Sequence, residues 1–459
     1  MLVSPFFARM YIMPKAQSSF DVKAVLHERL DLLLAGSDKV ADNAQFGQTF
    51  NDLENFFIRD GRKFIQDVLT LKLQERIERA EATDEAKQCP ECKKKTTMLN
   101  RKRKTILTFY NGLKIFRRRR SCDSCKSSSF PVDAILGLPK RYSDGLKERL
   151  AHNIGSASYR SVADTLKSYL GIHLSPTTIG NIADETADEM QVRLQKNTDV
   201  RKEFQKAKGE KVFLTDGTFI NTRNAEGEQE YREVKIAIVA KQECGDSATP
   251  EEWESRELPE PTVTYAVAAI EEKEKFQERV QEMRRFLGIG SVTSALADGA
   301  AWIWLLIFAV FGRVRECLDI YHALERVSAC GKALYGSGAT FTEWLDRMRL
   351  VLLSEGFVGI KRELDLLKVG LEPKSEECEA IDSLLEYLVK HSERLDYAAR
   401  LASGRAIGSG MVEGACKNLI GKRLKQTKAC WRVERANKIA IICSILYSDQ
   451  WEKAWNNTS

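Results

Sequence analysis

Two pairs of cysteines in the first third of the chain have the spacing of a metal site. Cys89 with Cys92, and Cys122 with Cys125, each form a CxxC motif. Four thiolates in two such pairs suit tetrahedral Zn²⁺, because each pair can wrap its backbone around one side of the ion. Four unrelated buried thiols or a redox pair are the alternatives, but no thioredoxin-like pattern surrounds either motif. We therefore predict a structural zinc site whose four positions are all filled by protein.

The segment between the cysteine pairs predicts a β-hairpin with a strongly basic face. Two runs, TILTFY and LKIFRR, flank Asn111 and Gly112, which favour a tight turn. Residues 93–120 contain twelve lysines and arginines and no acid. A merely soluble surface normally mixes both signs, so we interpret residues 86–135 as a zinc ribbon that binds the DNA backbone. The predicted contacts are Arg101, Lys102, Arg103, Lys104, Arg117, Arg118, Arg119 and Arg120.

A second DNA-binding element is predicted between residues 143 and 197. The run 159–170 has the periodicity of an amphipathic helix, and Ser175 followed by Pro176 is typical of the start of the next one. Two helices at this spacing suggest a helix-turn-helix that reads DNA. The same hairpin also occurs as a plain packing unit, so both interpretations stay open. The residues expected to face DNA are Thr177, Thr178 and Asn181.

Three acids later in the chain have neighbours that suggest an active site. Asp216 lies within the apolar run KVFLTDGTFI, where a carboxylate is costly to bury unless it meets a cation or a hydrogen-bond partner. Asp298 ends a short apolar run, and Glu413 lies in a glycine-rich helix start. Both aspartates precede glycine, so ordinary Asp-Gly turns are the alternative for each.

The order of the predicted elements gives these acids a common framework. Residues 211–270 contain three strand-like runs, followed by a charged helix, a strand ending at Asp298, an apolar helix and a fifth strand. This is the order of an RNase H-like fold, with acids on the first strand, after the fourth strand and on a later helix. Three clustered carboxylates offer the oxygen ligands that Mg²⁺ or Mn²⁺ prefers. Two such ions activate water or a 3′-hydroxyl for attack on a phosphodiester.

With these residues in view, the chain resembles the DDE transposases of bacterial insertion sequences, in the ISKra-like group. The resemblance rests on LTDGT around Asp216, ALADGAAWIW around Asp298, CLDIYHALERV at 317–327 and GSGMVEGACKNLIGKRLKQTKACW at 408–431. It covers most of the chain from the cysteine pairs onward, whereas the N-terminal helices match less clearly. The family implies Mg²⁺-dependent cleavage and joining of DNA at element ends. The catalytic acids and metal ligands that it implies are Asp216, Asp298 and Glu413.

The helix predicted to carry Glu413 also carries positive charge. Residues 414–438 contain eight lysines and arginines and a single acid, Glu434. A solvated helix face is the alternative, but the near absence of acids favours contact with DNA. The predicted contacts are Lys417, Lys422, Arg423 and Lys425. An accessory role near the site is predicted for three residues that otherwise have the spacing of ordinary helix neighbours, Asp319, His322 and Glu325.

Composition excludes several other classes of protein. Of the 459 residues, 43% are apolar, 30% are charged and 10 are prolines, which excludes a disordered or fibrous chain. The net charge of +6 conceals the two basic runs, because the rest of the chain must be acidic. The apolar run 299–312 is too short to span a bilayer. The N-terminus has no recognisable export signal and the eleven cysteines are irregularly spaced, so we expect a cytoplasmic, nucleoid-associated protein with no membrane partner.

These patterns together predict an α+β protein of several domains. We expect N-terminal helices (1–85), the zinc ribbon (86–135), the helix-turn-helix region (143–197), the first part of an RNase H-like core (208–327), a helical insertion (328–405) and C-terminal catalytic helices (406–459). The expected partner is double-stranded DNA, at element ends and targets, bound by a homo-oligomer that brings two ends together. A nuclease without strand transfer and an inactive or domesticated DNA-binding protein are the alternatives.

Overall fold

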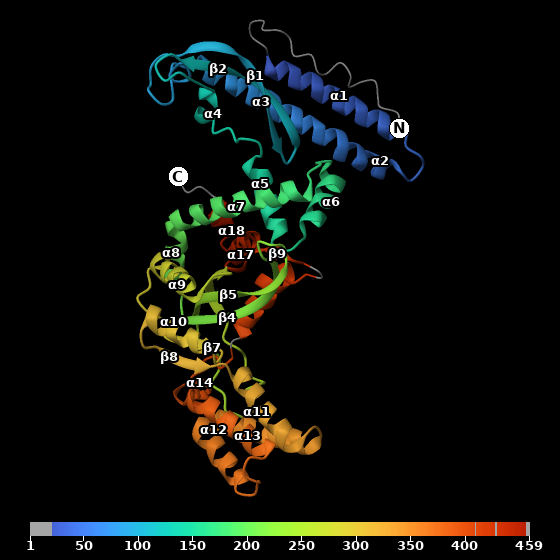
Figure 1. Ribbon diagram of the computed structural model, residues 1–459. Coiled ribbons are helices and arrows are strands. Elements are labelled where there is room, and N and C mark those ends of the chain that lie inside the picture. Colours follow the sequence, from blue (N-terminus) through green and yellow to red (C-terminus); the bar gives the residue numbers. More distant parts are fainter. Residues whose placement is uncertain (1–20, 409, 427–428, 456–459) are drawn as a thin grey trace. The chain divides into compact units, whose positions relative to one another are not determined.

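The computed structural model describes residues 21–408, 410–426 and 429–455, and the chain divides into two compact units (Figure 1). One unit contains Met1–Lys147 and Asp164–Leu174, and the other contains Glu148–Ala163 and Ser175–Ser459. Residues 1–20, where no export signal is expected, lie outside the described residues. Two helices, α5 (Asp144–Ile154) and α6 (Tyr159–Leu170), contain residues of both units.

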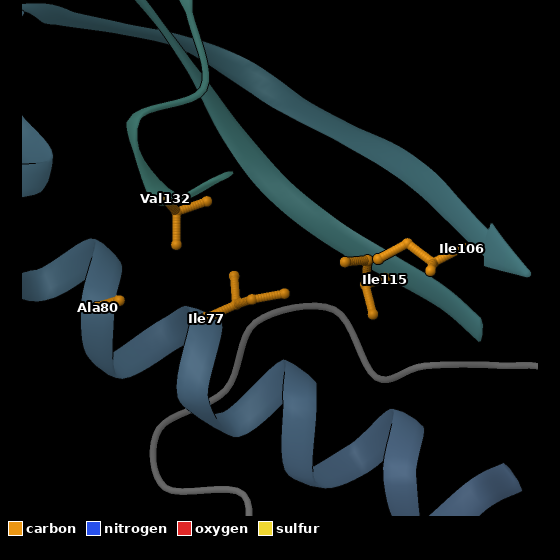
Figure 2. Close-up of a cluster of buried hydrophobic side chains, with 5 residues drawn as sticks. All are labelled: Ile77, Ala80, Ile106, Ile115 and Val132. Carbon is orange, nitrogen blue, oxygen red and sulfur yellow. The ribbon is translucent and has the colours of Figure 1, made fainter. Parts of the chain in front are cut away.

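The first unit joins long helices to a three-stranded sheet. Its further elements are α1 (Val22–Asp42), α2 (Thr49–Phe56), the π-helix η2 (Phe57–Gly61), α3 (Arg62–Ala82), the 3-10 helix η3 (Glu85–Lys87), β1 (Thr97–Thr108), β2 (Asn111–Cys122), β3 (Ser127–Ser129) and α4 (Pro131–Ile135). The helices and the ribbon share one buried cluster, drawn from α3, both hairpin strands and α4 (Figure 2). The cluster consists of Ile77, Ala80, Ile106, Ile115 and Val132. The segments predicted at 1–85 and 86–135 therefore belong to one packing unit.

The hairpin between the cysteine pairs forms, but its turn lies two residues before the predicted one. Thr108 pairs with Asn111, so Phe109 and Tyr110 make the turn, and Asn111 begins β2 with a left-handed backbone, φ 78°. Asparagine tolerates this conformation better than most residues. Arg62 of α3 donates to the carbonyl of Phe109 and lies over both aromatic rings. This contact from a distant helix explains why the turn closes on two aromatic residues.

Two side chains of α3 cover the backbone of β2. Gln74 Nε2 donates to Phe116 O at 3.0 Å, and Gln74 Oε1 accepts from Phe116 N at 2.8 Å. The carboxylate of Glu81 accepts from Arg118 N. Strand groups left unpaired are a template for association with other chains, so α3 both packs on the hairpin and completes its hydrogen bonding.

The second unit is built on one mixed sheet. Its strands follow the order β6-β5-β4-β7-β8, with β9 also paired to β4. The pairs β4–β5 and β5–β6 are antiparallel, and β4–β7 and β7–β8 are parallel. The strands are β4 (Glu210–Arg223), β5 (Gln229–Gln242), β6 (Pro261–Ala269), β7 (Ser294–Ala297), β8 (Arg315–Leu318) and β9 (Trp431–Arg432). The mixed sheet and its helices confirm the predicted α+β class.

Helices of the second unit cover this sheet and extend beyond it. They are α7 (Pro176–Lys196), α8 (Thr198–Lys206), α9 (Lys273–Leu287), α10 (Ala301–Phe311), α11 (Ile320–Tyr335), α12 (Ala339–Lys368), α13 (Glu376–Val389), η4 (Ser392–Arg394), α14 (Tyr397–Ala402), α15 (Gly410–Ala415), the π-helix η5 (Cys416–Gly421), α16 (Lys422–Leu424), α17 (Val433–Tyr447) and α18 (Trp451–Trp455). The helix α17 packs on β6 and α7, and α9 packs on β6 and α10. The centre of β5 is buried on both faces, as its unbroken apolar run requires.

The start of α7 follows the predicted pattern. Ser175 caps the helix by accepting from Thr178 N at 3.1 Å, and Pro176 occupies the first turn. The helix continues to Lys196 and buries a long apolar face against α17. Packing therefore accounts for most of α7, and DNA contact by its first turn remains a prediction.

The apolar run 299–312 forms α10, which buries one face and leaves Leu305 and Phe308 exposed. The predicted helical insertion contains α12, α13 and α14. Trp304 of α10 is buried and stacks with Arg394, whose guanidinium lies 4.3 Å from the indole centroid. Of the helices that the structure describes, none is both long and apolar enough to cross a membrane.

Candidate functional site

The four cysteines of the two CxxC motifs come together at the end of the β1–β2 hairpin. Their sulfur atoms all lie within 4.8 Å of one another, with Cys89 to Cys125 at 3.9 Å and Cys92 to Cys122 at 3.5 Å. Corners of a tetrahedron around Zn²⁺ with ordinary sulfur bonds are about 3.8 Å apart. The spacing therefore fits the predicted metal, and the cluster is compatible with a structural Zn²⁺ held by four thiolates.

Local backbone geometry explains how each cysteine pair presents its sulfurs. Lys93 and Lys126, which follow the second cysteine of each pair, both adopt left-handed conformations, with φ 59° and 52°. In the first pair, Cys89 N donates to Lys94 O at 2.8 Å and Lys93 N donates to Cys89 O at 2.9 Å. A backbone hydrogen bond from Lys94 lowers the pKa of Cys92 to about 7, which favours the metal-binding thiolate. Sequence analysis missed these two lysines because nothing but their position marks them.

The basic face of the ribbon is partly neutralised by acids from α3. The Glu81 carboxylate lies 3.1 Å from Arg118 Nε and 3.7 Å from Arg101 Nη2, and Glu78 lies 3.4 Å from Arg101. Residues 93–120 contain no acid, so the sequence of the hairpin alone overstated its charge. Arg118 and Arg101 remain partly exposed and keep some capacity to meet phosphate.

A second acid, Asp133 of α4, holds two more of the predicted DNA contacts. Its carboxylate lies 3.0 Å from Lys104 Nζ and 2.9 Å from Arg117 Nε. The Arg117 guanidinium also lies over the Phe130 ring at 3.6 Å, and both basic side chains are about nine-tenths buried. Lys104 and Arg117 are thus structural, which corrects their prediction as DNA contacts.

The other four predicted ribbon contacts are less constrained. Lys102 and Arg103 are exposed on β1. Arg119 donates to Ser128 Oγ, and Arg120 donates to the hydroxyl and carbonyl oxygens of Thr96. The exposed positive face is therefore narrower than predicted and centres on β1.

The two predicted catalytic aspartates lie next to each other in the sheet of the second unit. Thr215 of β4 pairs with Ala297 of β7, so the following residues, Asp216 and Asp298, are neighbours at the edge where β7 ends. Burial raises the pKa of Asp216, and the charge of Asp298 adds to that effect. A half-buried carboxylate beside a second acid is a position that a cation would stabilise.

Local hydrogen bonds orient both aspartates. Asp216 Oδ1 accepts from Gly217 N at 2.7 Å, and Asp298 Oδ1 accepts from Ala300 N at 2.9 Å, just before α10 begins. The second oxygen of Asp216 accepts from the Cys416 thiol, with Sγ to Oδ2 at 3.4 Å. Burial and the Asp216 carboxylate raise the pKa of Cys416, which keeps this thiol protonated as a donor. Sequence analysis missed Cys416, although it follows Glu413 by three residues.

The predicted accessory set extends the acidic edge to β8. Asp319 follows β8, is almost fully buried, and caps α11 by accepting from Tyr321 N at 2.6 Å and His322 N at 3.2 Å. His322 Nδ1 lies 3.6 Å from the same carboxylate, and this interaction raises the pKa of His322 to about 9. The charge of His322 also lowers the pKa of Asp216. Glu325 is exposed and acts on His322 only through its charge.

Glu413, the third predicted acid, is not gathered with the aspartates. It is exposed on α15, and its carboxylate accepts from Lys417 Nζ at 2.6 Å. Among the described residues, only the four cysteines bring three or more potential ligand atoms within 4.8 Å of one another. The helix α15 does pack on β4 and β5, so Glu413 belongs to the same region of the unit, with its charge compensated by a neighbouring lysine.

One predicted DNA contact on the C-terminal basic run is buried. Arg423 is 1% exposed, and its guanidinium lies between Tyr159 and Trp431, at 5.1 and 4.7 Å from their ring centroids. Its Nε donates to Ile154 O at 2.6 Å, whereas its Nη2 is buried without a hydrogen-bond partner. Arg423 is therefore a packing residue, and its prediction as a DNA contact is wrong. Tyr159 and Trp431 cause this burial, and neither the number nor the spacing of basic residues in the segment indicates it.

Substitutions at Arg423 test whether its volume or its charge stabilises the unit. Burial lowers the pKa of Arg423, which means that burying the charged guanidinium costs free energy. We expect Arg423→Ala to lower the free energy of unfolding by about 3 kcal/mol because it leaves a cavity. Arg423→Met, which keeps most of the volume, should cost about 1 kcal/mol or less. Urea denaturation followed by tryptophan fluorescence measures both, and equal losses would show that the charge is required.

The remaining predicted contacts lie on the surface. Lys422 and Lys425 are exposed, and Lys425 bonds Thr218 of β4. In α7, Thr177 is exposed, while the Thr178 hydroxyl lies 2.9 Å from Ser175 Oγ. The last predicted contact, Asn181, is exposed and accepts from Arg435 at 2.9 Å.

Comparison with protein-family models and with curated proteins gives no match to this chain. The chain has two candidate sites, a cysteine cluster suited to zinc and an acidic edge formed by neighbouring strands.

Proposed function

We propose that the chain is a Mg²⁺-dependent DDE transposase that cleaves and joins DNA at the ends of an insertion sequence. The observation that carries the proposal is the register of β4 and β7, which brings Asp216 and Asp298 together at one edge of the sheet, where burial raises the pKa of Asp216. The strand order β6-β5-β4-β7-β8, with three antiparallel and two parallel strands, supports an RNase H-like core. The likeness to insertion-sequence transposases in the motifs around both aspartates supports the reaction.

In this proposal the two aspartates hold the metal, Mg²⁺ or Mn²⁺. Their carboxylate oxygens are suitable ligands, and Asp216 gains compensation for its buried charge when a cation binds. The bound metal supplies activation of a water or 3′-hydroxyl and stabilisation of the leaving oxygen. Glu413 would become the third carboxylate ligand if it released Lys417 and bound the metal instead. The protonated His322 and the exposed lysines of α16 and its flanks face the negative charge of the DNA.

The zinc ribbon and the helix pair have the binding function in this proposal. The exposed cations of β1, with Lys102 and Arg103 at their centre, contact phosphates and position the protein on the duplex. Joining two element ends requires at least two chains, so the active form is a homo-oligomer. Such a protein works at the nucleoid of a bacterial cytoplasm.

A defined cleavage assay tests the proposal. Purified full-length chain is incubated with duplex DNA taken from inverted repeats flanking its gene, with and without Mg²⁺. We expect strand breaks at the repeat end only with Mg²⁺, and joined products only when the broken strand has a free 3′-hydroxyl. Breaks without joining would support a nuclease instead. Binding of the duplex without any breaks in the presence of Mg²⁺ would overturn the enzymatic proposal.

The position of Glu413 favours one alternative specifically. Its hydrogen bond to Lys417, away from the aspartate pair, suits a DNA-binding protein that does not cut. The two functions differ in metal response. A transposase requires Mg²⁺ for cleavage and gains thermal stability from it, whereas an inactive DNA-binding protein should show neither effect while still binding the repeats.

A further inference from the structure

Arg326 lies on α11 and contacts Tyr387, the residue that packs against the turn after Asp298. Arg326 follows His322 by one turn of α11, so the two share a face of that helix. Arg326 is exposed, and its guanidinium lies 5.0 Å from the centroid of the Tyr387 ring in α13. Among the described residues no carboxylate pairs with it. By contrast, the exposed arginines Arg347 and Arg362 of the neighbouring insertion pair with Glu363 and Glu355.

Tyr387 determines where this cation lies, because it packs against the turn that follows Asp298. A Cβ atom placed on Gly299 would lie 2.2 Å from the Tyr387 hydroxyl oxygen and 2.8 Å from its ring. The ring also packs on His391, with centroids 5.0 Å apart. Only glycine permits this approach, so the insertion is seated directly on the loop that carries a predicted catalytic acid.

Electrostatics agree with this placement. Burial raises the pKa of Tyr387, Arg326 opposes that effect, and the charge of Asp298 adds to it. The Tyr387 hydroxyl therefore lies within reach of both charges. A hydrogen bond from Arg326 also lowers the pKa of Tyr387, so the hydroxyl uses part of the guanidinium. An exposed guanidinium still has further N–H donors, and these match the oxygens of a phosphate.

We propose that Arg326, held in position by Tyr387, binds a phosphate of the DNA strand that enters the Asp216–Asp298 site. The inference rests on the proposed function and specifies its substrate contact. A phosphodiester that approaches a pair of carboxylates is stabilised by positive charge from the metal and from the protein. Arg326 provides it from α11, and Tyr387 is a positioning residue contributed by the insertion. The insertion thereby becomes part of the DNA-binding surface of the catalytic unit.

Kinetics and salt dependence of the full-length chain test this inference on flanking-repeat duplex DNA. We expect Arg326→Gln to raise the KM for DNA about tenfold with kcat changed less than about threefold. The slope of log affinity against log KCl should fall by about one, as for one lost phosphate contact. Arg326→Lys, which keeps the charge but not the planar fork, should recover part of the loss.

The role of Tyr387 is tested through Arg326. Tyr387→Phe keeps the ring and should change KM little, whereas Tyr387→Leu removes the stacking surface and should resemble Arg326→Gln. The double variant Tyr387→Leu with Arg326→Gln should be no worse than Arg326→Gln alone, because the two residues act as one. Additive losses would overturn the positioning role.

Arg362→Gln is the matched control, since Arg362 is an exposed arginine of the insertion that pairs with Glu355. It should leave KM and salt slope unchanged. Equal KM and equal salt slope in Arg326→Gln, in a chain that retains its thermal unfolding midpoint and cleaves DNA, would overturn the inference. If the unsubstituted chain binds but does not cleave, the proposed function fails, and the salt slope still decides whether Arg326 contacts phosphate.

Discussion

Asp216→Asn is expected to abolish Mg²⁺-dependent cleavage, with a loss of about a thousandfold or more, while leaving DNA binding intact. The substitution keeps the acceptor for Gly217 N and nearly the same volume, but it removes the charge that would hold the metal. Cleavage of repeat-end duplex, followed by gel electrophoresis under single-turnover conditions, measures the loss. Anisotropy titration with the same duplex measures binding.

The same substitution has a predicted effect on stability without metal. The pKa of Asp216 is raised in the folded chain, chiefly by burial. For an acid with a raised pKa, folding is favoured by protonation, so stability falls as pH rises from the unfolded pKa through the folded one. At neutral pH the ionised carboxylate is therefore unfavourable. We expect Asp216→Asn to raise the unfolding midpoint of the metal-free chain and to eliminate the further rise that Mg²⁺ gives the unsubstituted chain.

Asp382→Asn provides a matched control, because Asp382 is exposed in α13 and pairs with Lys368. It should leave cleavage and the Mg²⁺ response unchanged. Undiminished cleavage by Asp216→Asn would refute the assignment of this residue. If Mg²⁺ raised the unfolding midpoint of Asp216→Asn as much as that of the unsubstituted chain, metal binding at the acidic edge would be refuted.

Local patterns predicted the elements well, because they reflect short-range physics. The cap at Ser175 and Pro176 involves atoms within one turn of helix, so two adjacent letters suffice to predict it. The strand around Asp216 and the strand before Asp298 were predicted from apolar runs, and β-sheet pairing then made the aspartates neighbours. The cysteine cluster followed from spacing alone, since two CxxC pairs have few other uses.

Contacts between distant segments account for what the sequence could not predict. Arg423 is buried because Tyr159 and Trp431, far apart along the chain, enclose it. Lys104 and Arg117 are neutralised by Asp133, which lies outside the basic run. Periodicity and charge counts depend only on residues that are close in sequence. They therefore cannot reveal an ion pair or a packing contact with a residue on another helix or strand.

The candidate site shows the same division. Asp216 lies in β4 and Asp298 directly follows β7, and the parallel pairing of these strands makes the two aspartates neighbours. Glu413 lies on a short helix with Lys417 one turn away, and at that spacing the local ion pair competes with any metal site. Tyr387 was missed altogether, because its contact with Gly299 links segments separated by the whole of α10, α11 and α12.

Loss of the zinc ligands is expected to unfold the cysteine end of the ribbon and leave the mixed sheet of the second unit folded. We expect the double variant Cys89→Ser with Cys122→Ser to contain no zinc, because it removes one ligand from each CxxC pair. Residues 97–103 of β1 are exposed along their whole length, so no apolar core holds the cysteine end of the hairpin. Structural Zn²⁺ contributes on the order of 10 kcal/mol in small zinc domains.

Elemental analysis by mass spectrometry and hydrogen exchange of β1 and β2 measure this effect together. Protection should be lost near the cysteines and retained near Ile106 and Ile115, where α3 still packs on the hairpin. Affinity for DNA should fall because Lys102 and Arg103 lose their fixed backbone, while β4 and β5 keep their protection.

Cys244→Ser, at an exposed cysteine outside the cluster, is the control and should retain one zinc per chain. Unchanged zinc content in the double variant would refute the metal site, because two thiolates alone do not satisfy tetrahedral Zn²⁺.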